Sequence, residues 1–262
     1  MIKMLAAATG LLLATSTSAQ VKAGKITYER TVQMQILFTG SGMENMAPKS
    51  RTDRLELNFA DDKMTLRKIE EDLPEENLAS GGMVIRTFGG GADDVTFCDF
   101  SQQRKVEARE MFDKKFLITD SIKRGSWKLT EETKNILGYN CRKATMVRIS
   151  KRMMMNMENG ELQRKEVQDT TTMAAWFTMD IPVPGGPEMQ GQLPGMILEL
   201  ETGTGRLSYK AVEVSPKADM KALKEPTKGK KLTQEEYNKE RTAMLEEMQK
   251  NNPGGNRRIR ME

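Results

Sequence analysis

Histidine is absent from the 262-residue chain, and aromatic residues make up only 5% of it. The lack of histidine excludes Ser-His-Asp and Cys-His nucleophilic sites, zinc sites with histidine ligands, and any histidine general base. Beyond residue 19 no apolar run is long enough to cross a membrane as a helix. We therefore expect a protein that does not span a membrane, with no cofactor, no resident metal and no catalytic residues of these familiar kinds.

Cysteine is scarce as well, since the chain has only Cys98 and Cys141. Both lie in segments rich in strand-forming residues, so one intramolecular disulfide is possible in an oxidising compartment. Two independent buried thiols are the alternative. The spacing is unlike the C-x-x-C pattern of thioredoxin-like redox sites and argues against that function.

The chain has no large excess of charge of one sign, since it contains 41 basic and 37 acidic residues. A near-balanced chain lacks the self-repulsion typical of disordered proteins. The basic surplus lies in residues 217–262, where it could contact anionic lipid, although a solvated surface is the simpler interpretation. We do not expect a nucleic-acid partner.

Residues 1–19 have the pattern of a secretory signal peptide: a lysine, a short apolar stretch, and small residues before the cleavage point. Thr17 and Ala19 occupy the two positions that a signal peptidase requires, which predicts cleavage after Ala19. No cysteine follows this point, so a lipoprotein is not expected. The predicted location is the periplasm or the outer cell envelope.

Short strands dominate the rest of the chain. Leu55, Leu57 and Phe59 alternate with polar residues and predict a strand with one apolar face. A loop is predicted over residues 72–93, around a short strand at 83–88. The other strands are predicted at residues 25–38, 51–59, 64–69, 94–100, 104–109, 116–119, 126–130, 141–150, 161–170, 173–181, 196–201 and 206–214.

These strands predict a mainly β fold, an antiparallel curved sheet or incomplete barrel with a C-terminal helix; a β-sandwich is the alternative. The expected divisions follow the composition. They are a signal peptide (1–19), a β-rich domain (20–216), a basic linker (217–232), a C-terminal helix (233–250) and a disordered tail (251–262).

The C-terminal helix is predicted from its first turn. Thr233 and Glu236 have the spacing of a capping box, in which each side chain bonds the other's backbone amide. A narrow apolar stripe follows at Tyr237, Met244, Leu245 and Met248. Because this stripe is too small for an independent domain, the helix should lie against the outside or the open edge of the sheet.

Three ordered segments carry a family resemblance. They read WKLTEETKNILGYNCRKA (residues 127–144), AAWFTMDIPVPGGPE (174–188) and GQLPGMILELE (191–201). Together they resemble the GLPGLI family of exported Bacteroidetes proteins, with that family's name-giving motif altered here to G-Q-L-P-G-M-I. The family has no established function, so the resemblance implies compartment and lineage rather than chemistry.

The altered motif contains Gly191, Leu193, Pro194 and Gly195. Prolines and glycines before it force the chain to leave the sheet after Ile181. Pro194 and Gly195 suit the two central positions of a type II turn. The motif is either a rigid crossover with a buried leucine or a rim loop over a binding cleft.

Large side chains give two further predictions. Trp127 and Trp176 are predicted to anchor a core that is otherwise short of aromatic residues. Methionines cluster at Met153, Met154, Met155 and Met157, with two more at Met43 and Met46. A thioether site for Cu(I) is conceivable, but methionines on a strand point to alternate faces, which favours gap filling in the core.

Adjacent carboxylates occur at Asp61-Asp62, Glu75-Glu76 and Asp93-Asp94, where solvated turns are expected. We therefore expect a non-catalytic envelope protein that carries a lipid or other apolar ligand on a concave surface. One alternative is a carboxylate-dependent hydrolase acting on glycans or peptides. Another is an accessory protein that docks an outer-membrane partner through its C-terminal helix.

Overall fold

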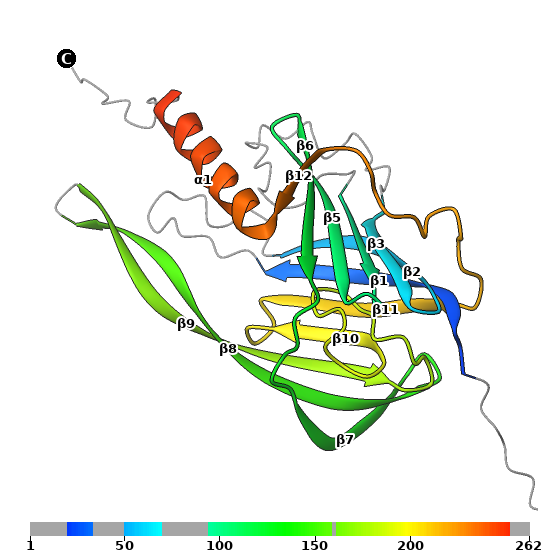
Figure 1. The fold of residues 1–262 in the computed structure, drawn as a ribbon. Coiled ribbons are helices and arrows are strands. Elements are labelled where there is room, and N and C mark those ends of the chain that lie inside the picture. Colours follow the sequence, from blue (N-terminus) through cyan, green and yellow to red (C-terminus); the bar gives the residue numbers. More distant parts are fainter. Residues whose placement is uncertain (1–19, 34–49, 70–93, 159–160, 252–262) are drawn as a thin grey trace, which may run out of the picture.

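One open, curved sheet, antiparallel except for its last strand pair, makes up most of the protein in a computed structural model that describes residues 20–33, 50–69, 94–158 and 161–251 (Figure 1). The strands are β1 (Ala23–Gln33), β2 (Ser50–Ala60), β3 (Lys63–Lys68), β4 (Val95–Asp99), β5 (Arg104–Met111), β6 (Lys114–Ser121), β7 (Lys128–Ile136), β8 (Tyr139–Glu158), β9 (Glu161–Thr178), β10 (Met196–Thr202), β11 (Leu207–Ser215) and β12 (Lys230–Thr233). The one helix in the described residues is α1 (Gln234–Asn251).

The described strands all belong to this sheet, in the order β12-β6-β5-β4-β3-β2-β1-β11-β10-β9-β8-β7. The predicted β fold with a curved sheet and C-terminal helix is confirmed, and the sandwich alternative is wrong. Twist accumulates from strand to strand, so in Figure 1 β5 and β6 stand upright while β10 and β11 run across. This twist gives the sheet a concave face.

The concave face holds the main core. Ile26 of β1 pairs with Leu57 of β2, and Phe59 of β2 pairs with Met64 of β3; all four side chains are completely buried. The predicted apolar face of β2 is therefore confirmed. A smaller cluster of Phe97, Val106 and Leu117 occupies the opposite, convex face of β4 to β6. Successive side chains on these strands thus pack into two separate apolar layers, one on each face of the sheet.

Residues 179–195 leave the sheet and fill the hollow of the concave face. Ile181, Val183 and Leu193 from this crossover loop are buried in the main core. The chain leaves the sheet after Thr178, where β9 ends, and not after Ile181 as predicted. The crossover loop therefore acts as an internal filling that holds the two halves of the bent sheet together.

The type II turn predicted at Pro194 and Gly195 is wrong. A type II turn needs a positive φ at its third residue, and Gly195 is not among the described glycines with positive φ. Glycine is required for a different reason: a Cβ on Gly195 would lie 2.0 Å from the backbone oxygen of Thr178. Leu193 is buried, as the rigid-crossover interpretation expects.

Two tight turns depend on glycines with a positive φ. Gly138, with φ of 88°, follows Leu137 in the connection between β7 and β8. Gly203 and Gly205, both with positive φ, turn the chain between β10 and β11. Several strand predictions were too short: β7 extends to Ile136 and β8 to Glu158, and β9 joins the two strands predicted at residues 161–170 and 173–181. Figure 1 shows these two strands as a long ribbon that projects from the sheet.

The two tryptophans lie at the edge of the main core. Trp127 and Trp176 are both half-buried, and both pack against the buried residues of the core. Trp127 donates a hydrogen bond to Gln192 in the crossover loop, at 2.9 Å. The ammonium groups of Lys134 and Lys143 lie over the Trp176 ring, at 4.4 and 5.7 Å from its centroid. The largest fully buried side chain is instead Tyr28, whose hydroxyl donates to the Ile197 carbonyl at 2.6 Å.

The segment predicted as a linker over residues 217–232 is built into the fold. Residues 216–229, here called the strap, run along the convex face, where the Asp219 amide donates to Asn58 at 3.0 Å. The chain then forms β12, which pairs in parallel with β6 at the sheet edge. In this part of the chain, the linker prediction is therefore wrong.

Helix α1 begins as predicted. The Thr233 amide donates to Glu236 at 2.7 Å, and the Glu236 amide donates to the Thr233 hydroxyl at 3.2 Å, which completes the capping box. The Tyr237 ring meets the edge of Phe116 on β6, with centroids 5.5 Å apart. The helix thus docks at the edge of the sheet. The predicted contacts of Leu245 and Met248 lie outside the described side chains.

Cys98 on β4 and Cys141 on β8 are free thiols, both completely buried. Between β4 and β8 in the sheet lie β3, β2, β1, β11, β10 and β9. The structure thus has the two separate thiols and not the possible disulfide. Burial raises the pKa of Cys98 to about 12 and that of Cys141 to about 11.

We expect both thiols to resist alkylation in the native protein and to react once the chain is unfolded. The reason is that only the thiolate is nucleophilic, and burial both disfavours it and blocks access. Intact-mass measurement after alkylation, with and without denaturant and with no reductant, tests this. An unreduced, unfolded chain that takes up no label and is lighter by two hydrogens would instead contain the disulfide.

Several predictions fall outside the described residues. They are the signal peptide, the loop at residues 72–93 and its strand, Met43, Met46, the tail from residue 252, and the side chains of the methionine cluster on β8. Among the residues that are described, no helix has the length and apolar character needed to cross a membrane.

Candidate functional site

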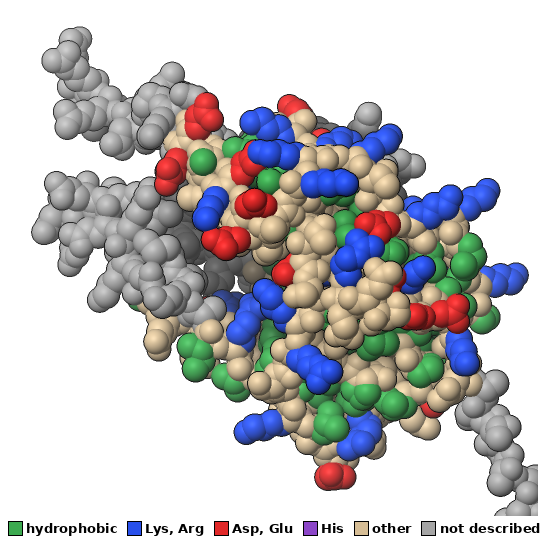
Figure 2. Space-filling model, in the orientation of Figure 1, with side chains coloured by type: hydrophobic (Ala, Val, Ile, Leu, Met, Phe, Trp, Pro, Cys, Tyr) green, Lys and Arg blue, Asp and Glu red, His purple; other side chains and the backbone are tan. Residues whose placement is uncertain are grey.

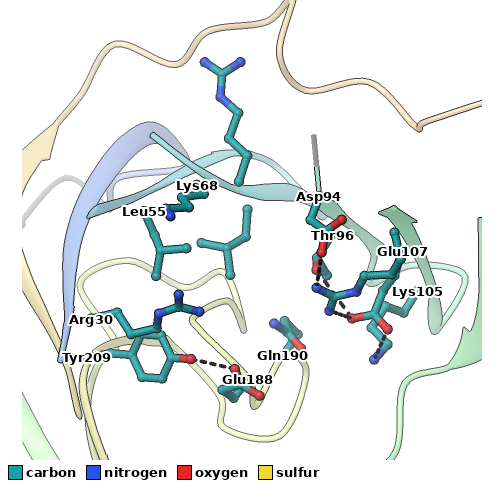
Figure 3. A pocket seen from close by; sticks show the side chains of 13 residues that line it. Arg30, Leu55, Lys68, Asp94, Thr96, Lys105, Glu107, Glu188, Gln190 and Tyr209 are labelled. Carbon is teal, nitrogen blue, oxygen red and sulfur yellow. Dashed lines mark hydrogen bonds and ion pairs between the residues drawn. The ribbon is translucent and has the colours of Figure 1, made fainter. Parts of the chain in front are cut away.

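A charged pocket opens on the concave face, beside the crossover loop (Figure 3). It has a volume of about 120 Å³, room for a group the size of an amino-acid side chain. Below it is called the concave pocket. Its lining residues are Arg30, Leu55, Leu66, Arg67, Lys68, Asp94, Thr96, Lys105, Glu107, Arg109, Glu188, Gln190 and Tyr209.

Strand register explains one charged wall of this pocket. Arg30 follows Ile26 and Tyr28 on the concave face of β1 and pairs with Asp53 of β2. Arg30 Nη2 lies 2.5 Å from Asp53 Oδ2, and Lys68 Nζ lies 3.1 Å from Asp53 Oδ1. The apolar stripe of the core therefore ends in a layer of ion pairs.

Asp53 is almost fully buried, with only 5% of its side chain exposed. Burial alone would raise its pKa, but the hydrogen bonds and positive charges of Arg30 and Lys68 outweigh burial and lower the pKa below its ordinary value. Arg51 adds a third cation, 3.1 Å away. Asp53 thus stays ionised and fixes the positions of the basic groups at the pocket.

Tyr209 and Glu188 continue this wall. Tyr209 lies opposite Arg30 on the neighbouring strand β11, and its hydroxyl donates to Glu188 Oε1 at 2.6 Å. Burial, together with the Glu188 charge, raises the pKa of Tyr209, so the phenol stays protonated and able to donate. Glu188 has a positive φ of 60°, an uncommon conformation for a residue other than glycine. The crossover loop therefore holds this carboxylate in a fixed, strained position.

The second wall comes from β4 and β5. Arg109 contacts two carboxylates, Asp94 Oδ2 at 3.0 Å and Glu107 Oε1 at 2.9 Å. Asp94 also accepts the Glu110 amide at 2.9 Å, and Lys105 lies 3.5 Å from Glu107. Figure 3 shows this group across the pocket from Arg30 and Glu188, with Gln190 between the two.

One donor in the pocket is left over. Arg30 Nε is buried and has no hydrogen-bond partner within the described part of the chain. Buried donors are nearly always satisfied, so an unpaired one needs a reason. Because this nitrogen has almost no accessible surface, an acceptor could pair with it only if the Arg30 side chain shifted.

The acidic groups of the pocket are already engaged by partners. Asp94 and Glu107 are each held by the same arginine, and Glu188 accepts from a protonated phenol. Within the described ranges no three acidic or cysteine side chains are grouped to hold a metal.

The predicted site residues contribute to the pocket only indirectly. Leu193 and Gly195 are buried behind it, and neither they, Gly191 nor Pro194 line it. The same loop nevertheless supplies Glu188 and Gln190. Among the described members of the carboxylate pairs singled out in the sequence, which are Asp61, Asp62 and Asp94, only Asp94 reaches the pocket, and it is an ion-pair partner rather than a solvated turn residue.

Comparison with known proteins finds a family similarity over part of the chain. Residues 127–199 match the family described as "Protein of unknown function (Porph_ging)", which is associated with Bacteroidetes. The match runs from the start of β7 into β10 and includes the whole crossover loop. It overlaps the segments on which the GLPGLI resemblance is based, although the matched family has a different name. No curated protein matches the chain.

Solved structures of PNGF-II in the C2 and P21 space groups are also similar. They are 19% and 18% identical to the chain, with TM-scores of 0.49 and 0.47. Each comparison covers 83% of this chain but only 32% of the PNGF-II chain. The chain thus spans about a third of the length of these structures.

Proposed function

We propose that this protein is a non-catalytic binding protein of the cell envelope that holds a small anionic or zwitterionic group in the concave pocket. The observation that carries the proposal is the pair of charged walls around a cavity of about 120 Å³. The Gln190 amide can donate to the ligand, and the Tyr209 hydroxyl, whose proton goes to Glu188, holds that carboxylate in place. A carboxylate on an amino acid, peptide or sugar acid would match this set.

The pocket lining modifies the ligand expected from the sequence. An acyl chain needs an apolar cavity, whereas the concave pocket is lined largely by charged side chains. A polar ligand therefore replaces the apolar one in this proposal. Assignment to the exported GLPGLI proteins, with cleavage after Ala19, remains part of the proposal. It is supported by the altered motif and by the match to a Bacteroidetes-associated family. N-terminal sequencing of protein from its native envelope tests the cleavage point.

Tyr209→Phe should weaken ligand binding about tenfold, because it removes one hydrogen bond to a charged network while keeping the ring. The test is calorimetry with a panel of amino acids, short peptides, sugar acids and fatty acids. Tyr139→Phe is the matched control, since Tyr139 is half-buried on β8 and does not line the pocket.

Two outcomes would contradict the proposal. The first is binding of fatty acids alone, unaffected by Tyr209→Phe, which would favour the apolar carrier. The second is turnover of a glycan or peptide that is lost in Glu188→Gln, which would make the protein a hydrolase. If no member of the panel binds, the concave pocket is not a ligand site.

A further inference from the structure

The strap, residues 216–229, presents a row of lysines to solvent on the convex face. Lys217, Lys221, Lys224 and Lys228 are all exposed and make no ion pair with any described residue. Lys231, just beyond in β12, is exposed and unpaired in the same sense. Figure 2 shows Lys and Arg side chains gathered where the strap and β12 cross the molecule.

The two acidic residues of the strap do not neutralise this row. Glu225 is held by Arg104, whose two terminal nitrogens lie 2.8 and 2.6 Å from its carboxylate oxygens. Asp219 accepts the backbone amides of Lys221 and Ala222, at 2.9 and 3.3 Å, in a tight turn. Both carboxylates thus serve the attachment and shape of the strap, and its four lysines outnumber these two acids, which leaves the strap positively charged.

A groove of about 730 Å³ runs between the strap and the convex face of the sheet. Lys221, Lys224 and Lys228 line it from the strap side, together with Lys115 from β6. Glu56 is the other acid in its lining and is bound by Arg67 at 2.6 Å. The groove is therefore positively charged along the strap.

An apolar side chain accompanies these charges. Met220, between Asp219 and Lys221, is 61% exposed. Lysines supply mobile point charges that do not demand one fixed ligand geometry. Exposed lysines around a protruding apolar side chain suit a surface of anionic headgroups, which offers both phosphate charge and an apolar interior.

We propose that the strap docks the protein onto an anionic lipid surface, with the lysines against lipid phosphates and Met220 inserted between headgroups. This surface lies on the opposite face of the sheet from the concave pocket. The proposal is therefore independent of the ligand proposed there, and a docked protein would keep that pocket open to solvent.

The test is co-sedimentation of the full mature chain with vesicles of phosphatidylglycerol and phosphatidylcholine, and with vesicles of phosphatidylcholine alone. Binding should require the anionic lipid and weaken in high salt. The triple change Lys221→Glu, Lys224→Glu and Lys228→Glu should weaken it at least about tenfold, since each lysine near such a surface contributes on the order of 1 kcal/mol.

Two triple variants with the same change in charge serve as controls. One alters Lys128, Arg142 and Arg148 to glutamate, on the exposed surface of β7 and β8 at the far edge of the sheet. The other alters Arg257, Arg258 and Arg260 to glutamate, in the C-terminal tail. Both should retain most of the binding. A loss as large as that of the strap variant in either one would overturn the assignment to the strap.

Insertion is tested by Met220→Trp, whose added fluorescence should shift to shorter wavelength and be quenched by brominated anionic lipid. An unchanged spectrum on bound vesicles would overturn the placement of Met220. Equal binding to neutral vesicles would overturn the charge-based mechanism. Binding to a soluble sulfated polysaccharide, with none to vesicles, would identify a soluble polyanion as the partner and overturn the lipid proposal.

Discussion

Gly195→Ala should destabilise the protein by about 3 kcal/mol, at the upper end of what overpacking of a core costs. The added methyl carbon would lie 2.0 Å from the Thr178 oxygen and 2.8 Å from its carbonyl carbon. These are backbone atoms at the end of β9, and they cannot turn aside as a flexible side chain can. Either the crossover loop or the end of the strand must move. Urea unfolding of the wild type and the variant measures the effect.

Gly138 provides the matched control, because it needs to be glycine for a different reason. A Cβ there would meet nothing within 4 Å, but the residue has a positive φ. Gly138→Ala should therefore cost about 1 kcal/mol, and Gly138→Asn less, since asparagine tolerates this conformation. At Gly195 the order should reverse, with asparagine worse than alanine. Equal costs of alanine at both positions would contradict the steric explanation.

Local sequence patterns predicted most of the fold, because the burial of a strand face and the capping of a helix depend on residues that are close together in the chain. The alternation of Leu55, Leu57 and Phe59 reports which face of β2 is buried. Thr233 and Glu236 report where α1 begins, since their spacing lets each side chain bond the other's amide. The parallel pairing of β12 with β6 was missed, because it joins segments more than a hundred residues apart and leaves no local pattern.

The partial burial of Trp176 shows that the position of a residue on its strand matters as well as its size. Trp176 lies between Ala175 and Phe177 on β9, and both of those neighbours are buried. The face that Trp176 occupies also carries Lys134 and Lys143 over its ring. Size favours burial, but strand alternation decides which face a side chain takes.

The concave pocket was also missed, although a signal for it exists in the sequence. Arg30 continues the alternation of Ile26 and Tyr28, and Asp53 precedes Leu55 on the same face of β2. Arg30 and Asp53 carry opposite charges, and each lies at the end of an apolar stripe. This pattern indicates that ion pairs replace apolar contacts at that end of the core. The sequence alone does not give the register that brings Arg30 and Asp53 together, nor the loop path that carries Glu188 to Tyr209.

The family match covers only part of the concave pocket. The matched family region, residues 127–199, contains the crossover loop but none of the pocket residues on β1 to β5. The pocket is thus assembled from a segment that resembles known sequences and from strands outside the match. A ligand that depends on Arg30 and Arg109 is therefore set by residues that the family match does not cover.

Asp53→Asn should destabilise the protein by about 2 kcal/mol at neutral pH, because it removes a buried charge that three cations share. Arg30, Arg51 and Lys68 would keep their charges but lose their common partner. The effect should fall short of that of a fully buried pair, since these side chains are 24%, 43% and 28% exposed and water would partly compensate. Glu29→Gln, which removes a carboxylate from an exposed ion pair with Arg54, is the control and should cost little.

The dependence of this difference on pH separates lost charge from lost packing. The pKa of Asp53 is lower in the folded protein than its ordinary value, so folding favours the ionised form. The stabilisation should therefore be complete above the ordinary aspartate pKa of about 4 and disappear as the pH falls through the lower, folded value. In urea unfolding at a series of pH values, the wild type should lose stability relative to Asp53→Asn only in this acidic range. A difference that stays constant from neutral to strongly acidic pH would mean that the variant acts through packing, and that Asp53 does not organise the charged wall electrostatically.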